Sequence, residues 1–151
     1  MQARNVCYGT RDNDFGIFHI TDTGILKDIK LVHVSGLLKC SVEAGWRWGC
    51  NLDDGKNYFA TVITNAENTV IFPQKGVVLD DINRFEIPVY KASTATSMKY
   101  GDLQEHTYIQ NGTELRIWFG EDLKDVHEDD NSGKHCVDVY AKMKVLKGRV
   151  A

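Results

Sequence analysis

The sequence predicts an all-β protein, an antiparallel β-sandwich of the jelly-roll type. Apolar and polar residues alternate along most of the chain, whereas no stretch sustains the helical apolar period of about 3.6 residues. Turn-forming residues separate roughly eight or nine short candidate strands, a pattern that is typical of sandwiches and barrels. The chain has 151 residues and no linker, so we expect one domain over residues 1–151 with a sizeable core.

The first clear strand covers residues 27–36, KDIKLVHVSG. Ile29, Leu31 and His33 share one face, and the opposite face also carries valines. Because both faces are partly apolar, we expect a central strand that is covered on both sides. Residues 57–73 then predict a hairpin, with two strand-like runs on either side of the turn-like sequence NAEN.

The second half of the chain predicts further strands. Residues 85–90 are strand-like but contain Pro88, which indicates an edge strand or a bulge. Residues 106–120 predict the clearest hairpin, since two β-rich runs flank the Asn-Gly pair at Asn111. Residues 135–143 predict the last strand. After the Asn-Gly turn, one face carries Leu115, Ile117 and Phe119, and the other carries Glu114, Arg116 and Trp118. The residues expected to face inward in the last strand are Val137, Val139, Ala141 and Met143.

Charge and hydropathy exclude two classes of partner. The formal net charge is −3 and the sequence pI is about 5.9, so no basic stripe is available to neutralise nucleic-acid phosphates. No apolar run approaches the length of a membrane span, so we expect no membrane insertion.

The four cysteines favour a secreted protein. Cys7, Cys40, Cys50 and Cys136 include no CxxC pair, so disulfides fit better than metal-type spacing. Three connectivities are open, and we favour Cys40–Cys50 and Cys7–Cys136. The start, MQARNVCYG, lacks an apolar leader, which fits a cytosolic protein or a mature secreted domain. The tripeptide Asn-Gly-Thr at Asn111 would suit a secreted surface turn.

One segment, residues 120–133, is unusually acidic, and we call it the acidic loop. Solvated loops are often charged, but these like charges lie between two well-marked strands and among Asn, Ser and Gly residues. Such hard oxygen ligands suit Ca²⁺, and a bound cation would stabilise the cluster. The spacing does not match an EF-hand. The carboxylates of the loop are Glu121, Asp122, Asp125, Glu128, Asp129 and Asp130.

The stretch TELRIWFGEDLKDVHEDDNSGKHCVDVYAKM, residues 113–143, resembles the C-terminal hairpin of bacterial galactose-specific, calcium-dependent lectins of the LecA type. Weaker similarity covers residues 29–50, which include IKLVHVSG and RWG. The resemblance implies a galactose-binding-domain-like jelly roll. It places Asp122 at the family's loop aspartate, and Asp130 and Asn131 at its two asparagines. The loop here is one residue longer and more acidic.

In that family these side chains and two backbone carbonyls bind one Ca²⁺, which in turn binds two sugar hydroxyls. The resemblance therefore implies Asp122, Asp130 and Asn131 as ligands of both the metal and the sugar. His127 is the one nitrogen ligand inside the run and joins the candidate metal ligands. Asp125 joins the candidate sugar contacts. Trp48 is a further candidate because aromatic rings stack on sugars, although large aromatic residues more often cover a core edge.

No catalytic motif is visible, so we expect no enzyme. The sequence has neither G-x-S-x-G nor H-E-x-x-H, and His33 within a strand fits a core residue better than a catalyst. The sequence thus predicts a secreted, calcium-dependent glycan-binding protein, with a galactose-type sugar as partner and homo-oligomerisation left open. Two alternatives are an extracellular structural or adhesion domain with a structural Ca²⁺, and a small β-sandwich hydrolase.

Overall fold

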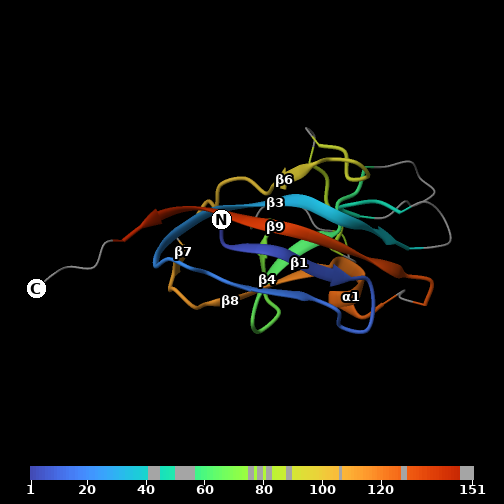
Figure 1. The fold of residues 1–151 in the computed structure, drawn as a ribbon, viewed down its shortest axis with the longest axis horizontal. Helices are drawn as coiled ribbons and strands as arrows, with labels where there is room; N and C mark the ends of the chain where they lie inside the picture. The colour runs from blue at the N-terminus through green and yellow to red at the C-terminus, as the bar shows by residue number, and fades with distance from the viewer. Residues whose placement is uncertain are drawn as a thin grey trace, which may run out of the picture.

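The structure is a computed structural model that describes residues 1–40, 45–49, 57–74, 77, 80, 83–87, 90–105, 107–126 and 129–146. Two antiparallel sheets pack as a sandwich (Figure 1), which confirms the predicted fold class. One sheet has the strand order β1 (Ala3–Gly9), β9 (Ser132–Val145), β3 (Gly24–Lys39) and β6 (Ser97–Lys99), with β7 (Thr107–Ile109) also beside β3. The other has the order β2 (Gly16–His19), β8 (Glu114–Phe119), β4 (Thr61–Asn65) and β5 (Val70–Phe72).

The longest strands, β3 and β9, form the centre of the first sheet. They pair from Gly24 opposite Val145 to Lys39 opposite Ser132. β3 also pairs with β6 on its other side, so the central position predicted for residues 27–36 is confirmed. A short helix, α1 (Gly120–Lys124), follows β8. Within the described residues, no helix is long and apolar enough to cross a membrane.

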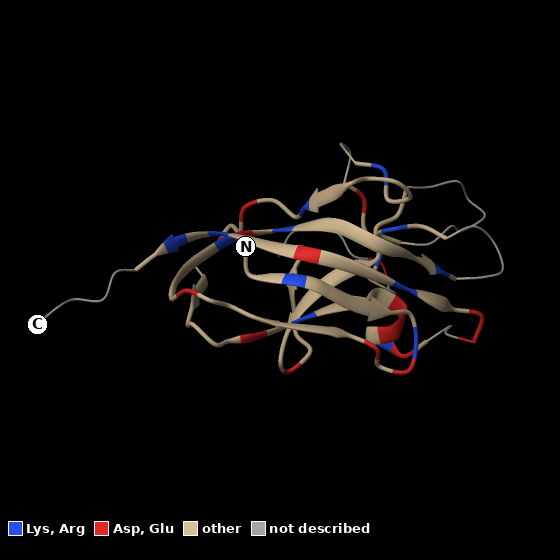
Figure 2. Ribbon diagram, viewed as in Figure 1, with Lys and Arg blue, Asp and Glu red and all other residues tan. Residues whose placement is uncertain are grey.

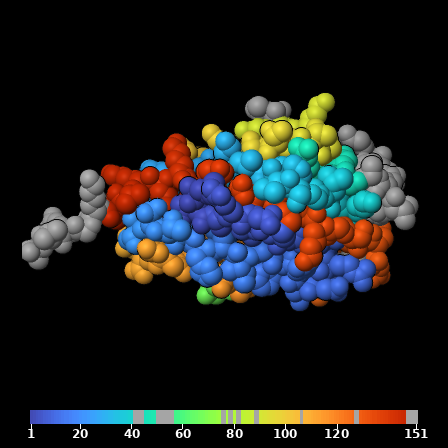
Figure 3. Space-filling model, in the orientation of Figure 1, coloured from blue at the N-terminus to red at the C-terminus, as the bar shows by residue number. Residues whose placement is uncertain are grey.

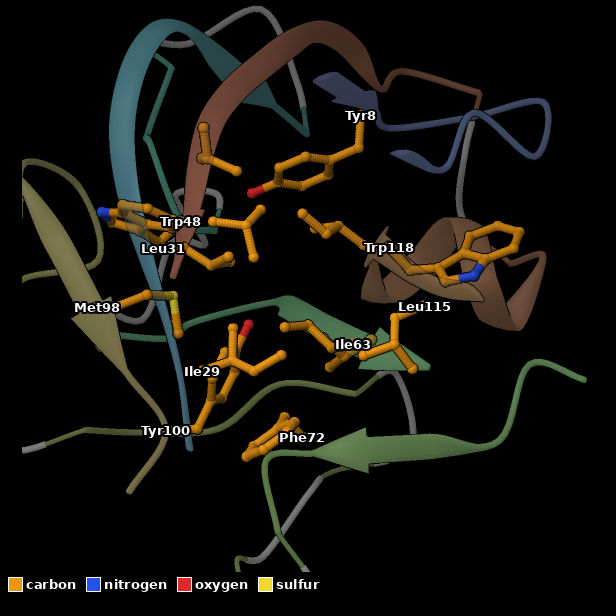
Figure 4. Packing of buried hydrophobic residues seen from close by; sticks show 14 of the residues in the cluster. Tyr8, Ile29, Leu31, Trp48, Ile63, Phe72, Met98, Tyr100, Leu115 and Trp118 are labelled. Atoms are coloured by element: carbon orange, nitrogen blue, oxygen red, sulfur yellow. The ribbon is translucent and has the colours of Figure 1, made fainter. Parts of the chain in front are cut away.

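The core lies between the two sheets. Figure 4 shows Ile29 and Leu31 of β3 meeting Ile63 of β4 and Leu115 of β8, with Tyr8 of β1 above them. None of these side chains is more than 1% exposed. Burial of one large aliphatic side chain stabilises a fold by about 1.5–3 kcal/mol, so this apolar layer is the main support of the sandwich. The inward positions expected in β9 are buried or packed against the core, whereas β8 buries Trp118 as well as the apolar residues of its other face.

The predicted hairpin over residues 106–120 is wrong. β7 pairs with β3 in the first sheet, whereas β8 pairs with β2 and β4 in the second. The turn itself exists, and Gly112 has a φ of +91° there. However, the turn carries the chain from β7 in the first sheet to β8 in the second, and the amide of Gly112 bonds to the carbonyl of Ile20 just after β2. The hairpin predicted within residues 57–73 is confirmed by the pairing of β4 and β5.

Two other features differ from the expected pattern. Residues 85–90 form no strand in their described part, where Phe85 makes an isolated bridge to Phe59, and Pro88 lies outside the described residues. β1 and β2 were not predicted. Their residues form the blue surface that continues into the red and orange surface of β9 in Figure 3.

A disulfide joins β1 to β9. Cys7 and Cys136 lie directly opposite each other in the two strands, and their sulfur atoms are bonded. This confirms the predicted bridge between the N-terminal segment and the last strand. Cys40 is also disulfide-bonded, but its predicted partner Cys50 lies outside the described residues, so that pairing stays a prediction.

Replacing Cys7 and Cys136 together by serine is expected to lower the free energy of unfolding by about 2–4 kcal/mol. The disulfide joins residues 129 positions apart, so it strongly restricts the unfolded chain. Equilibrium unfolding in urea of the parent and the double variant measures the difference. Coincident unfolding curves would contradict this expectation.

Candidate functional site at the acidic end of the sandwich

Acidic residues gather at the end of the sandwich where α1 lies. Figure 2 shows red segments on α1 and on the loops around it. Here β8 ends, α1 follows, and β9 begins after the acidic loop (Figure 1). The first part of the loop is therefore helical, and the helix ends at Asp125, which has left-handed backbone angles with a φ of 57°.

Asp122 fixes the loop between β1 and β2 to α1. Its side chain is buried at 1% exposure. One carboxylate oxygen accepts a hydrogen bond from the amide of Asn13 at 2.9 Å, and the other accepts one from the amide of Asp14 at 2.8 Å. Both oxygens of this predicted ligand are thus already engaged by backbone donors, and its metal role stays a prediction.

Glu121 is a second buried carboxylate at this end, and it was not singled out as a ligand from the sequence. Its Oε1 lies 3.3 Å from Sγ of Cys40 at the end of β3. Burial, and then the negative charge of Asp130, raise the pKa of Glu121 to about 7; Arg84 lowers it and Asp80 raises it further. A nearby cation would favour the ionised carboxylate and offset this cost.

Asn131 supplies the third buried polar group. It is 2% exposed, and its Nδ2 donates a hydrogen bond to the carbonyl of Thr10 at 3.2 Å. Its Oδ1 is buried with no hydrogen-bond partner among the described residues, and the same holds for Oγ1 of Thr10. A buried oxygen without a partner is costly, so an amide oxygen in this position fits a cation ligand.

The other predicted ligands of the acidic loop are not buried with Asp122 and Asn131 in the described structure. Asp130 is exposed and acts on Glu121 through its charge, and Asp125 is exposed at the end of α1. His127 lies outside the described residues. In the part of the chain that the structure describes, no three His, Cys, Asp or Glu side chains converge as a metal site. A Ca²⁺ site here would therefore need amide or backbone oxygens, such as Oδ1 of Asn131, in its ligand set.

A polar pocket of about 570 Å³ adjoins Asn131. It is lined by the loop after β1 and by the start of β9, and Lys134 forms an ion pair with Asp14 across it at 3.1 Å. Arg11 also lines this pocket and donates a hydrogen bond to the carbonyl of Asp129. Charged and amide groups of this kind can both donate to and accept from ligand hydroxyl groups.

The predicted sugar contact of Trp48 is wrong, because its ring is not accessible. Trp48 is 0% exposed. Its Nε1 donates a hydrogen bond to the carbonyl of Ala95 at 2.7 Å, and its ring packs edge-on against His135 at 4.6 Å between centroids. Trp48 is therefore a core residue, as large aromatic residues usually are.

A chain of buried polar side chains runs through the core near Trp48. The Tyr8 hydroxyl bonds to Oγ1 of Thr61 at 2.6 Å and to Nδ1 of His135 at 2.9 Å. Nε2 of His135 then bonds to Nδ1 of His33 at 2.8 Å. These groups satisfy one another, with Tyr8, Thr61 and His135 buried and His33 half-buried at the end of the hydrogen-bonded series, so His33 has a structural role but is not fully a core residue.

The contribution of His135 to stability is expected to fall as pH decreases from about 6.5 toward 3. Burial, then the nearby His33 and Arg47, lower the pKa of His135 to about 3, whereas an unfolded histidine titrates near 6.5. Below about pH 6.5 the unfolded chain therefore takes up a proton that the folded protein rejects. Each unit of pKa difference is worth about 1.4 kcal/mol. Urea unfolding between pH 8 and pH 4 measures the effect.

A His135→Gln variant should lose part of this pH dependence. Glu121, whose pKa is raised, contributes stability at low pH that is lost as pH rises, and it does so in both proteins. The difference between the two profiles thus isolates His135. The exposed His19 provides a matched variant, His19→Gln, which removes a histidine from the surface and leaves the buried hydrogen bonds of His135 in place. An equal slope in the parent and His135→Gln would contradict this account.

Comparison with solved structures found AJLec from the sea anemone Anthopleura japonica, with a TM-score of 0.84 and 32% sequence identity. The similarity covers 95% of this chain and 95% of that chain. No protein-family model and no curated protein sequence gave a match. The matching structure supports a jelly-roll-like sandwich over that 95% of the chain.

Proposed function

We propose that this chain, which belongs to the family of the sea anemone lectin AJLec, binds glycans through a Ca²⁺ ion held at the acidic end of the sandwich. The family is one of lectins, which are not enzymes, so the prediction that the chain is no enzyme is confirmed and the hydrolase alternative is set aside.

The unpartnered Oδ1 of Asn131 carries the calcium proposal. This oxygen is buried where the acidic loop meets β9, in the sequence context that resembles the LecA-type loop. The residues that would hold the ion are Asn131, Asp130 and Glu121, together with backbone carbonyls. Asp122 and His127 stay predicted ligands, the first through oxygens that also accept backbone hydrogen bonds.

A galactose-type sugar is the proposed ligand. When bound, Ca²⁺ supplies open coordination positions for two neighbouring hydroxyl groups. In this proposal the exposed Asp130 would accept hydrogen bonds from those hydroxyls, the buried Asn131 would act on them mainly through the ion, and the exposed Asp125 is a further candidate contact. The polar pocket beside Asn131 gives the rest of an oligosaccharide a surface rich in donors and acceptors.

We also propose that the protein is extracellular. The Cys7–Cys136 disulfide supports this, because disulfides persist in oxidising compartments. A glycan is the proposed partner, and a homo-oligomer would allow several sugars of one surface to be bound at once.

Calcium is expected to raise the melting temperature. An ion that binds only the folded protein stabilises it by about 2.7 kcal/mol at a hundredfold excess over its Kd. Thermal unfolding in millimolar calcium, in magnesium and in chelator measures the shift. The same midpoint in calcium and in chelator would rule out the metal site.

A structural ion is the alternative function of this site. The hydrogen bonds that Asp122 accepts from the loop between β1 and β2 favour a structural ion, since an ion nearby would further rigidify this end of the sandwich. A structural ion predicts calcium-dependent melting with no glycan binding, whereas the proposed lectin site predicts both.

A further inference from the structure

We propose that Asn111 is a site of N-linked glycosylation. The tripeptide Asn111-Gly112-Thr113 has the acceptor sequence for this modification, and it is the one N-x-S/T tripeptide in the chain. The inference is independent of the proposed calcium and sugar site.

The tripeptide occupies the turn between β7 and β8, and this turn faces solvent. Asn111 and Gly112 are exposed, and within the described residues the Asn111 side-chain amide has no hydrogen-bond partner. A Cβ atom added to Gly112 would meet no atom within 4 Å, so the space around the turn is open. The Nδ2 group can therefore carry a large substituent without displacing any neighbour.

The backbone of the turn is held independently of the Asn111 side chain. The amide of Asn111 donates to Oγ1 of Thr23 at 3.0 Å, and that of Gly112 donates to the carbonyl of Ile20 at 2.7 Å. The carbonyl of Thr113 accepts from the amide of Ile20 at 3.0 Å. A glycan on Asn111 would thus leave these backbone hydrogen bonds unchanged.

The position also suits a protein that recognises ligands at its other end. The turn lies at the end of the sandwich opposite α1 (Figure 1). A bulky glycan there stays clear of the acidic loop. The Cys7–Cys136 disulfide further indicates folding in an oxidising secretory compartment, where N-glycosylation of secreted proteins also takes place.

The reaction transfers an oligosaccharide from a lipid-linked diphosphate donor. The bond between the sugar's anomeric carbon and the diphosphate oxygen breaks, and the lipid diphosphate leaves with the electron pair. A new bond forms between the anomeric carbon and Nδ2 of Asn111, and Nδ2 releases one of its two protons to the leaving diphosphate, directly or through solvent. The product is a neutral amide, so the charge of the turn does not change.

Expression with a secretory leader in animal cells, followed by a peptide N-glycosidase, tests the proposal. We expect the secreted protein to lose the mass of one glycan on treatment, and to carry Asp at position 111 afterwards in peptide mass spectrometry. Asn111→Gln and Thr113→Val should be secreted without the glycan, because each removes one element of the acceptor sequence.

Thr113→Ser is the matched control, since it keeps the acceptor hydroxyl and should keep the glycan. Secreted parent protein with unmodified Asn111 would overturn the proposal, as would a glycan that persists in Asn111→Gln. The modification state of Asn111 is measured in the parent protein, so poor folding of a variant cannot hide the result.

Discussion

Replacing Trp48 by alanine is expected to lower the free energy of unfolding by about 3–5 kcal/mol, the usual loss for a buried aromatic residue. The ring is fully buried and its Nε1 donates to the carbonyl of Ala95. The substitution therefore creates a cavity and removes the shorter of two hydrogen bonds to that carbonyl, which keeps only the one from Arg47 at 3.5 Å. Because small domains are stable by only about 5–15 kcal/mol, the loss should be large enough to lower expression at physiological temperature.

Trp46 provides the matched comparison. It lies two residues earlier, is half-buried, and makes a backbone bridge to Leu38. Trp46→Ala should therefore cost clearly less in urea unfolding than Trp48→Ala. A Trp48→Ala protein that is as stable as the parent but has lost glycan binding would show that the ring contacts sugar, which would contradict its assignment to the core.

Replacing Asn131 by alanine is expected to abolish calcium-dependent glycan binding. The change removes Oδ1 from the proposed ion and Nδ2 from the hydrogen bond to Thr10. Loss of groups that support a metal site typically reduces metal affinity by about 10–100-fold, and removal of a direct ligand should cost at least as much. Calcium titration followed by melting temperature, and glycan binding in calcium, measure the two effects.

Two further variants make this result specific. Asn131→Asp keeps a side-chain oxygen and adds negative charge, so it should retain more calcium binding than Asn131→Ala. Asn111→Ala changes an exposed asparagine at the opposite end and should bind calcium and glycan as the parent does. Unchanged glycan binding by Asn131→Ala would contradict the proposed site.

The sequence predicted the sandwich because its strongest signals are local. The alternating pattern of β3 places Ile29 and Leu31 inward, and the structure buries both. The Asn-Gly turn at Asn111 was also predicted correctly as a turn. The segments that contact this turn were not predicted. The hydrogen bond from Gly112 to Ile20 joins residues far apart in the chain, and no local pattern indicates which sheet a strand enters.

The candidate site was predicted less completely for the same reason. The sequence marked the carboxylates of the acidic loop but could not assign an environment to each one. With about 3.6 residues per helical turn, neighbours in α1 point to different surroundings, so Glu121 lies beside Cys40 while Asp122 bonds to the loop after β1. Burial of Trp48 likewise depends on tertiary contacts, with Ala95 and His135, that no nearby residue indicates.

The most direct test of the proposed function is binding of the parent protein to a broad glycan panel, measured in calcium, in chelator and after calcium is restored. The account predicts binding to galactose-type glycans in calcium, its loss in chelator, and its recovery when calcium returns. Equal binding in chelator would contradict the role of calcium. Absence of binding to every glycan in calcium, despite a calcium-dependent melting temperature, would instead assign the acidic end to a structural ion.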